Sequence, residues 1–449
     1  MGIVSESTLE PETLHEPSLA PEVMEGGTER RLGRRQITGL IFGALGLILI
    51  ALVAPNITSE TKAFAFELPP DPLQFTFSPP TMVIIISVVY LMTAAIGFLG
   101  SRWSIWAGRA QLLSAALTIV LILVVALALS GSNQTNVTNL LDESLVLATP
   151  IALGAMTGLW CERSGIINIG IEGMMLGAAG VGFMAFAVLG AASSTGWLWI
   201  AILIAIVTGG LLALLHAVLS INYGINQIVS GVVINLFALG LTGFLRSEVI
   251  VPSGNSKGIS TAEFGIPLLQ ELPILGETLF QGKPLHYVMY LVVFLTWLVM
   301  FRTAWGLRVR SCGENPHAAE TLGIDVIKIR YQAVVLGGFI AGIAGAWFSM
   351  ESQSGFEDNM TNSAGFIALA AMIFGKWTPW GAFGGALLFG FARALGSRLQ
   401  FLGVEIGGFG IPSEFFQSLP YLVTIVVVAG ALGRSIAPAA EGQPYSPSK

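Results

Sequence analysis

Polar side chains stand inside two membrane-length apolar stretches of the chain, where they are energetically costly and therefore rarely incidental. One group is a pair four residues apart, which would share a helix face, and the other is a stripe at helical spacing. Amide and hydroxyl groups donate and accept hydrogen bonds without a net charge, so the stripe suits a neutral, hydroxyl-rich solute. The candidate substrate-path residues are Asn168, Glu172, Asn226, Gln227, Ser230 and Asn235.

Each group also has a structural explanation. Asn168 and Glu172 would instead tie helices together or cap a broken helix, since Gly173 and Gly177 allow close helix packing. The stripe that ends at Asn235 would equally serve hydrogen bonding between helices. The substitution Asn235→Leu separates the two explanations, because a residue outside the path would leave solute affinity and uptake rate unchanged.

The chain lacks the motifs of common enzymes and metal sites. The patterns GxxxxGK[ST], HExxH and CxxC are absent, so the chain has no P-loop for ATP phosphates. Its two cysteines, Cys161 and Cys312, lie at unrelated positions and form no metal-ligand pattern. We therefore expect no catalytic residue, no metal site and no cofactor bound by this chain itself.

The composition is that of an integral membrane protein. Of 449 residues, 54% are hydrophobic and 11% are charged, whereas soluble domains carry about 25% charged residues. A span needs about 20 mainly apolar residues, so we predict an all-α polytopic transmembrane bundle of about ten to twelve spans. The predicted spans are 36–55, 81–100, 110–130, 143–160, 166–190, 196–219, 226–246, 285–302, 331–350, 364–376, 380–398 and 417–434.

The distribution of charge predicts the orientation. Lys and Arg are concentrated in the loops that share a side with the N-terminus, which places both termini in the cytoplasm of a multi-pass plasma-membrane protein. Residues 1–35 are predicted to be a disordered acidic cytoplasmic tail, 36–137 extra N-terminal transmembrane segments, 138–434 the transport core, and 435–449 a cytoplasmic C-terminal tail.

Two similar segments within the sequence suggest an inverted repeat. The stretch GGLLALLHAVLS at 209–220 resembles GGALLFGFARALGS at 384–397, and the predicted topology runs the two in opposite directions. Similar segments of opposite direction are typical of transporters whose solute site lies between two repeats.

A short polar helix is predicted between two spans. Asn315 is a good N-cap residue, Pro316 suits the first helical position, and Gly323 can end the helix in the left-handed conformation. So short a helix is unstable alone in water and needs a surface. Docking to another protein and lying on the membrane both remain open on these grounds.

Three separate blocks carry a family resemblance. SCGENPHAAETLGIDVIKIRYQAVVLGGFIAGIAGAWFSM, from Ser311, resembles the cytoplasmic coupling loop, here 303–328, and the next span of ABC importer permeases for simple sugars, nucleosides and branched-chain amino acids. GLWCERSGIINIGIEGMMLGAA at 158–179 and AMIFGKWTPWGAFGGALLFG at 371–390 resemble the nucleoside-type branch. The matching coupling positions are Gly313, Glu314, Asn315, Pro316, Ala318, Ala319, Gly323 and Ile324.

This resemblance implies a permease subunit rather than an enzyme. A separate ATPase subunit would hydrolyse ATP, a second permease subunit, homologous or identical, would complete the membrane part, and an extracellular solute-binding lipoprotein would deliver the solute. The implied solute is a nucleoside, with a simple sugar such as a pentose as the alternative. The expected surroundings are membrane lipid, with no nucleic acid partner.

A second class, the ion-coupled secondary transporter, also has inverted repeats and a site at the midplane. It needs a membrane carboxylate for coupling, for which Glu172 is the clear candidate, but it has no need of the capped helix at 315–323. An intramembrane enzyme is a third class, and no paired catalytic residues at membrane depth support it.

Overall fold

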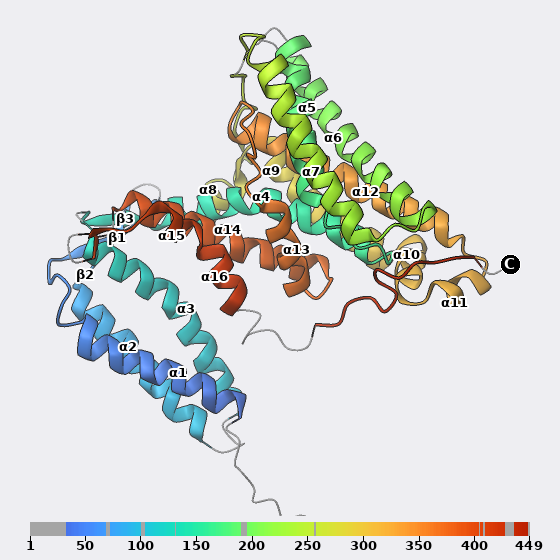
Figure 1. Ribbon diagram of the computed structural model, residues 1–449. Coiled ribbons are helices and arrows are strands. Elements are labelled where there is room, and N and C mark those ends of the chain that lie inside the picture. Colours follow the sequence, from blue (N-terminus) through green and yellow to red (C-terminus); the bar gives the residue numbers. More distant parts are fainter. Residues whose placement is uncertain are drawn as a thin grey trace, which may run out of the picture.

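The computed structural model describes residues 33–68, 72–99, 104–130, 132–189, 195–255, 257–403, 405–406, 409–426 and 435–447 (Figure 1). Most of the predicted acidic tail, the ends of several predicted loops and residues 427–434 of the last predicted span lie outside these ranges.

The predicted all-α, polytopic bundle is confirmed. Within the described ranges, nine helices are long and apolar enough to cross a membrane. They are built on α1 (Arg34–Ile48), α2 (Pro79–Phe98), α3 (Ser104–Leu129), α4 (Val137–Glu162), α5 (Ile171–Leu189), α6 (Thr195–Ala217), α7 (Gln227–Leu245), α9 (Pro284–Arg302) and α12 (Val326–Ala346). Wide π-helical turns extend α1, α6, α7 and α12 at Leu49–Val53, Val218–Asn222, Arg246–Ile250 and Trp347–Ser352.

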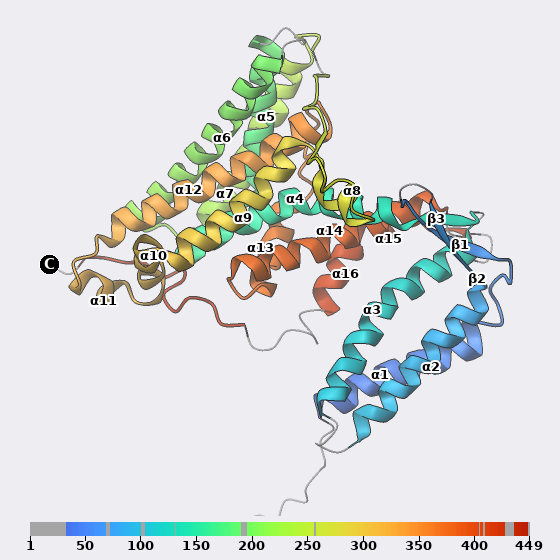
Figure 2. The same ribbon diagram turned by 180° about the vertical axis from the view of Figure 1, so that it is seen from behind.

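Shorter or less apolar helices fill the remaining positions. The three other predicted spans correspond to α13 (Ala364–Phe374), α14 (Pro379–Phe401) and α16 (Leu419–Val426). The connections contain α8 (Leu275–Phe280), α10 (Ala304–Glu314), α11 (Pro316–Thr321) and α15 (Ser413–Gln417). Figure 2 shows α9 leading into α10 and α11 on the face hidden in Figure 1.

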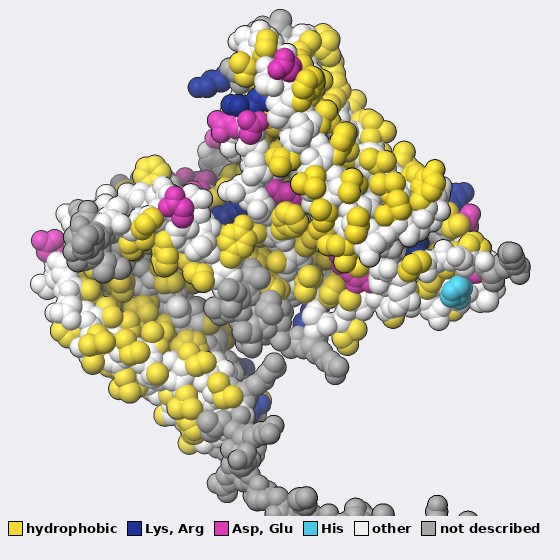
Figure 3. All heavy atoms as spheres, viewed as in Figure 1, with side chains coloured by type: hydrophobic (Ala, Val, Ile, Leu, Met, Phe, Trp, Pro, Cys, Tyr) yellow, Lys and Arg dark blue, Asp and Glu magenta, His cyan; other side chains and the backbone are white. Residues whose placement is uncertain are grey.

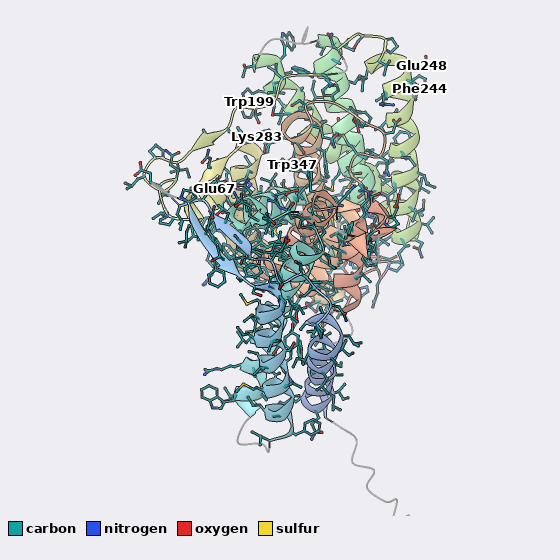
Figure 4. All side chains as sticks on the ribbon, turned by 90° about the vertical axis from the view of Figure 1, so that its left-hand side faces the viewer. Glu67, Trp199, Phe244, Glu248, Lys283 and Trp347 are labelled. Carbon is teal, nitrogen blue, oxygen red and sulfur yellow. The ribbon has the colours of Figure 1, made fainter. Side chains whose placement is uncertain are left out.

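Helices α1–α3 form an N-terminal unit with a small sheet. The sheet has the order β2-β1-β3, in which β1 (Lys62–Phe66) pairs antiparallel with β2 (Leu73–Phe77) and parallel with β3 (Gln134–Asn136). Figure 4 shows α1–α3 extending from this sheet away from the rest of the molecule, with Glu67 at the junction. Two-residue strand pairs, β4 (Phe264–Gly265) with β5 (Gln281–Gly282) and β6 (Glu405–Ile406) with β7 (Phe409–Gly410), complete the extended structure of the described chain.

The central helices pack in a reciprocal arrangement. Helix α6 lies along α12 while α14 lies along α4, and α5 contacts α12 while α13 contacts α4. Glycines permit the closest crossings, because a Cβ at Gly209 would collide with Gly338 and one at Gly390 would collide with the Ser144 carbonyl. The helices therefore form two groups of three, α4–α6 and α12–α14. The first helix of each group packs against the second and third helices of the other group, as expected of an inverted repeat.

Large apolar side chains cover the outside of the bundle. Leu236 and Phe237 on α7 are 64% and 50% exposed, and Ile228 and Val233 lie on the same exposed surface. Figure 3 shows hydrophobic side chains over the outer faces of α5–α7 and over the N-terminal unit. Such a surface is stable in lipid rather than in water, which agrees with the composition.

Candidate solute path and coupling site

The chain breaks between α4 and α5, and this corrects one prediction. Residues 163–170 are irregular, so Asn168 lies before α5 and does not share a helix face with Glu172. Gly165 has a φ of +93°, a conformation that side chains beyond glycine rarely adopt and that turns the chain out of α4. Most of this irregular stretch is buried, so its backbone groups need hydrogen-bond partners from the rest of the protein.

Helix α7 provides several of those partners. The Gln227 Oε1 accepts a hydrogen bond from the Ile167 N–H at 2.6 Å. The Asn235 side chain accepts from the Gly173 N–H at 2.7 Å and donates to the Ile169 carbonyl at 3.1 Å. Two members of the predicted polar stripe therefore hold the break between α4 and α5 against α7.

His216 of α6 completes this set of contacts, and sequence analysis gave it no role. Its Nε2 lies 2.9 Å from the Ile167 carbonyl, and its Nδ1 lies 2.9 Å from the Ser230 Oγ. Because a carbonyl can only accept, Nε2 carries the hydrogen and Nδ1 accepts from the Ser230 hydroxyl. His216 is fully buried. Its partners are 14 and 49 residues away along the chain, so no local pattern reveals the role.

The remaining amides of the two predicted groups differ in exposure, since Asn226 is exposed and Asn168 is buried. Asn226 caps α7, with its Oδ1 accepting from the Ile228 N–H at 2.9 Å. Asn168 is fully buried, and its Nδ2 lies 3.3 Å from the Cys161 Sγ and 3.5 Å from the Met174 Sδ. We call Asn168, Gln227, Ser230, Asn235 and His216 the polar hub.

Glu172 forms hydrogen bonds with the loop before α13 and with the start of that helix. Its Oε1 accepts from the Thr361 hydroxyl at 2.6 Å and from the Ser363 N–H at 2.9 Å, and its Oε2 accepts from the Gly365 N–H at 2.6 Å. These donors precede and begin α13, whose N-terminal end favours a negative charge. The Arg393 guanidinium on α14 interacts favourably with the same carboxylate.

A polar cavity lies beside α14, away from the polar hub. It has a volume of about 400 Å³ and is bounded by α14, α15 and α16, with Leu147 of α4 and Ile367 of α13. One guanidinium nitrogen of Arg393 donates to the Asn362 carbonyl at 2.7 Å. The polar side chains on its wall come from Asn362, Arg393, Ser397, Gln400, Glu414, Gln417, Ser418 and Tyr421. Arg393, Ser397 and Gln400 have helical spacing on α14, but the polar side chains that face them come from segments more than ten residues away along the chain, so the group as a whole was not predicted.

The predicted polar helix is present as α11. The Asn315 Oδ1 accepts from the Ala318 N–H at 3.0 Å, Pro316 is the first helical residue, and Gly323 has a φ of +79°. Ala319 and Pro316 are buried against the same chain, so their small size serves packing within this chain. Leu322, by contrast, is 82% exposed beside the end of α11.

Residues 437–445, the C-terminal strap, return to this helix. The Ala440 N–H donates to the Gly313 carbonyl at 2.9 Å, and the Gly442 N–H donates to the Gly165 carbonyl at 3.1 Å. The ring of Tyr445 lies 5.3 Å from the ring of His317. The strap therefore joins α11 to the break between α4 and α5.

A carboxyl group of the strap is held at this junction. Glu441 lies against the carboxyl of Glu162, and burial raises the pKa of Glu441 above its ordinary value. Arg163 follows Glu162, and its Nη1 lies 3.9 Å from the Glu314 Oε1. Its Nε and Nη2 donate to the Trp377 carbonyl at 2.9 and 2.7 Å. The coupling loop, the first break and the turn before α14 thus meet at Arg163.

Comparison with known proteins identifies the family to which this chain belongs. The family model described as "Branched-chain amino acid transport system / permease component" matches residues 140–428. The chain belongs to this family. The match starts in α4, so the N-terminal unit α1–α3 lies outside it. The permease component is a transport protein, which agrees with the multi-pass membrane bundle and with the absence of enzyme motifs in the sequence.

Curated relatives of this permease support the assignment. The guanosine ABC transporter permease protein NupQ of Bacillus subtilis is 37% identical over 318 residues, which cover 69% of this chain and 97% of NupQ. The nucleoside ABC transporter permease protein NupC of Lactococcus lactis is 39% identical over 321 residues, covering 70% and 100%. A putative glucose ABC transporter permease protein of Haloferax volcanii is 35% identical, covering 66% and 92%. No solved structure matches the chain.

Proposed function

We propose that this permease translocates nucleosides through the plasma membrane as a subunit of an ATP-driven importer. The observation that carries the proposal is α11, a capped helix that exposes Leu322 and is tied at its start to the break between α4 and α5. The nucleoside relatives, which match the chain over nearly their whole length, support this class of solute.

In this proposal a separate ATPase subunit docks on α11 from the cytoplasm, so both chain termini are cytoplasmic. A second permease subunit and an extracellular solute-binding lipoprotein complete the assembly. The exposed coupling positions, among them Glu314, Ala318 and Gly323, lie on or beside the docking surface, while Ala319 and Pro316 fix α11 to the permease.

The contacts at Arg163 can transmit a displacement of α11 to the membrane helices. A shift of α11 pulls on Glu314, which pairs with Arg163, and on the Gly313 carbonyl, which is joined to Gly165 through Ala440 and Gly442 of the strap. Arg163 also holds the turn before α14, and Glu172 links the start of α5 to the start of α13. Both halves of the repeat therefore respond to one displacement, which is what alternating access between two states requires.

Two other candidate functions are less well supported. A sugar is the alternative solute, because one relative is named as a putative glucose permease. An ion-coupled secondary transporter would need a carboxylate that exchanges protons or ions. Glu172 is a poor candidate for that role, since its two carboxylate oxygens already accept three hydrogen bonds from the start of α13 and the loop before it.

Uptake of labelled guanosine by the assembly in proteoliposomes tests the proposal. We expect accumulation that needs ATP on the ATPase side and does not change when an ion gradient is collapsed. Accumulation driven by a proton or sodium gradient without ATP would overturn the ATP-driven function. Uptake of labelled ribose without uptake of guanosine would replace the solute class.

A further inference from the structure

We propose that the cavity bounded by α14, α15 and α16 is a nucleoside-binding site on the translocation path, with Glu414, Gln417 and Tyr421 as ligand-contacting residues. This inference rests on the proposed nucleoside import and assigns a place for the solute within the chain.

The size and position of the cavity suit a transported solute. Its volume of about 400 Å³ falls within the range of roughly 300–1,000 Å³ typical of small-molecule sites. Leu147, which lines it, belongs to the first half of α4, whereas Arg163 beside α11 follows the last residue of that helix. The cavity therefore contacts the half of α4 that lies away from the coupling helix, on the side from which a solute delivered from outside arrives.

A half-buried guanidinium on α14 lines the cavity. Arg393 lies inside α14 and is held by the Asn362 carbonyl and by the charge of Glu172. Charged side chains within membrane helices are rare and line solute pathways when they face a water-filled space. Arg393 is linked through Glu172 to the start of α5, so it also connects the cavity to the break that moves with α11.

The wall matches the hydrogen-bonding groups of a nucleoside. The Glu414 carboxylate accepts from two neighbouring hydroxyls, as a ribose 2′,3′-diol offers, and the amides of Gln400 and Gln417 donate and accept toward a base edge. Tyr421, which is 48% exposed, adds an aromatic ring on which a base can stack. Arg393 and Glu414 are the charged side chains among the residues that line the cavity.

A second cavity provides a contrast within the same molecule. It has a volume of about 260 Å³ and lies between α4, α8, α9 and the end of α12. Its wall holds the carboxylates of Asp142, Glu263, Glu277 and Glu351 with Lys283 as the opposing charge. Its wall shares no residue with the α14–α16 cavity, so its residues serve as matched controls.

Equilibrium binding of labelled guanosine to the purified permease–ATPase assembly, without the binding protein, tests the site directly. We expect Glu414→Gln and Gln417→Leu each to raise the Kd for guanosine at least tenfold and to lower maximal uptake in proteoliposomes by a similar factor. The control Glu263→Gln should change neither quantity more than twofold. Glu414 and Gln417 are exposed, so the variants retain the fold, which co-purification with the ATPase verifies.

The outcomes distinguish this site from the solute class itself. If the native assembly neither binds nor imports guanosine, the proposed nucleoside function fails and the site assignment fails with it. If the native assembly imports guanosine while Glu414→Gln and Gln417→Leu bind and import it normally, only the site assignment is overturned. A loss of guanosine binding in Glu263→Gln, with the α14–α16 variants unaffected, would move the site to the acidic cavity.

Discussion

The polar hub and the cavity beside α14 contain the same kinds of side chain in opposite situations. In the hub, Asn235 and Gln227 hydrogen-bond to backbone groups of the break between α4 and α5. In the cavity, Gln400, Glu414 and Gln417 border open space. Residue type alone therefore does not distinguish a structural polar group from a solute-binding one. The distinction depends on whether the side chain bonds to buried protein groups or borders open space.

The energetic consequences differ accordingly. Removing a side chain whose partner is a buried backbone group leaves that group without a hydrogen bond, at a cost of about 1–3 kcal/mol for each group. Removing a side chain that borders water leaves nothing buried and unpaired. Substitutions in the hub should therefore act on stability, and substitutions in the cavity should act on solute binding.

The largest loss of stability is expected for Glu172→Ala. It leaves the Thr361 hydroxyl and the N–H groups of Ser363 and Gly365 without an acceptor and removes a counter-charge from Arg393. We expect a cost of roughly 3–5 kcal/mol. Thermal unfolding of the detergent-purified permease measures it, and Glu172→Gln, which keeps the shape, should lose less. Equal unfolding temperatures for Glu172→Ala and the native chain would show that Glu172 does not stabilise the start of α13.

A smaller loss is expected for Asn235→Leu. The Gly173 N–H and the Ile169 carbonyl lose their partner, at a cost of about 2 kcal/mol. The folded fraction should bind guanosine with the native Kd, because Asn235 faces protein. A tenfold higher Kd for guanosine in a fully stable Asn235→Leu variant would show that Asn235 contacts the solute. The polar hub and the cavity would then not differ in the way proposed here.

Removing the C-terminal strap should affect coupling more than stability. A chain ending at Ile436 loses the bonds from Ala440 to Gly313 and from Gly442 to Gly165, each worth about 1 kcal/mol. We expect the spans to stay folded while ATP-dependent uptake falls several-fold, as measured by unfolding temperature and by transport in the same preparation. Normal uptake by the shortened chain would show that α11 holds its position without the strap.

The smallest effect on stability, within about 0.5 kcal/mol, is expected for Leu322→Asp, because this side chain is almost fully exposed. Co-purification with the ATPase should nevertheless drop sharply. Ala319→Asp is the matched contrast: it places a carboxylate in a buried position and should destabilise the permease itself. Undiminished ATPase binding by Leu322→Asp would argue against docking at this end of α11.

Much of the fold follows from the sequence. Apolar length locates the spans, and the residues Asn315, Pro316 and Gly323 determine α11 because capping and chain reversal are local events. The break after α4 lies between two predicted spans, but the second span was predicted to begin at 166, whereas α5 begins at Ile171. The true position of Asn168 was therefore missed, because Ile166, Ile167 and Ile169 are as apolar as the residues of a span.

The site was harder to predict, for a physical reason. His216, Arg393 and Glu414 acquire their surroundings from helices far away along the chain, so no local spacing marks them. The predicted coupling positions lie together at α11, but burial separates Ala319, which packs inward, from Leu322, which projects outward. That distinction depends on how α11 lies against the rest of the chain.

Photo-crosslinking with 8-azidoguanosine, followed by mapping of the labelled peptides, tests the distinction between hub and cavity most directly. The intact assembly is illuminated with and without excess guanosine. Labelling that guanosine suppresses should fall within residues 393–421, which line the cavity beside α14. Guanosine-suppressible labelling confined to residues 226–235, in the hub, would contradict the account.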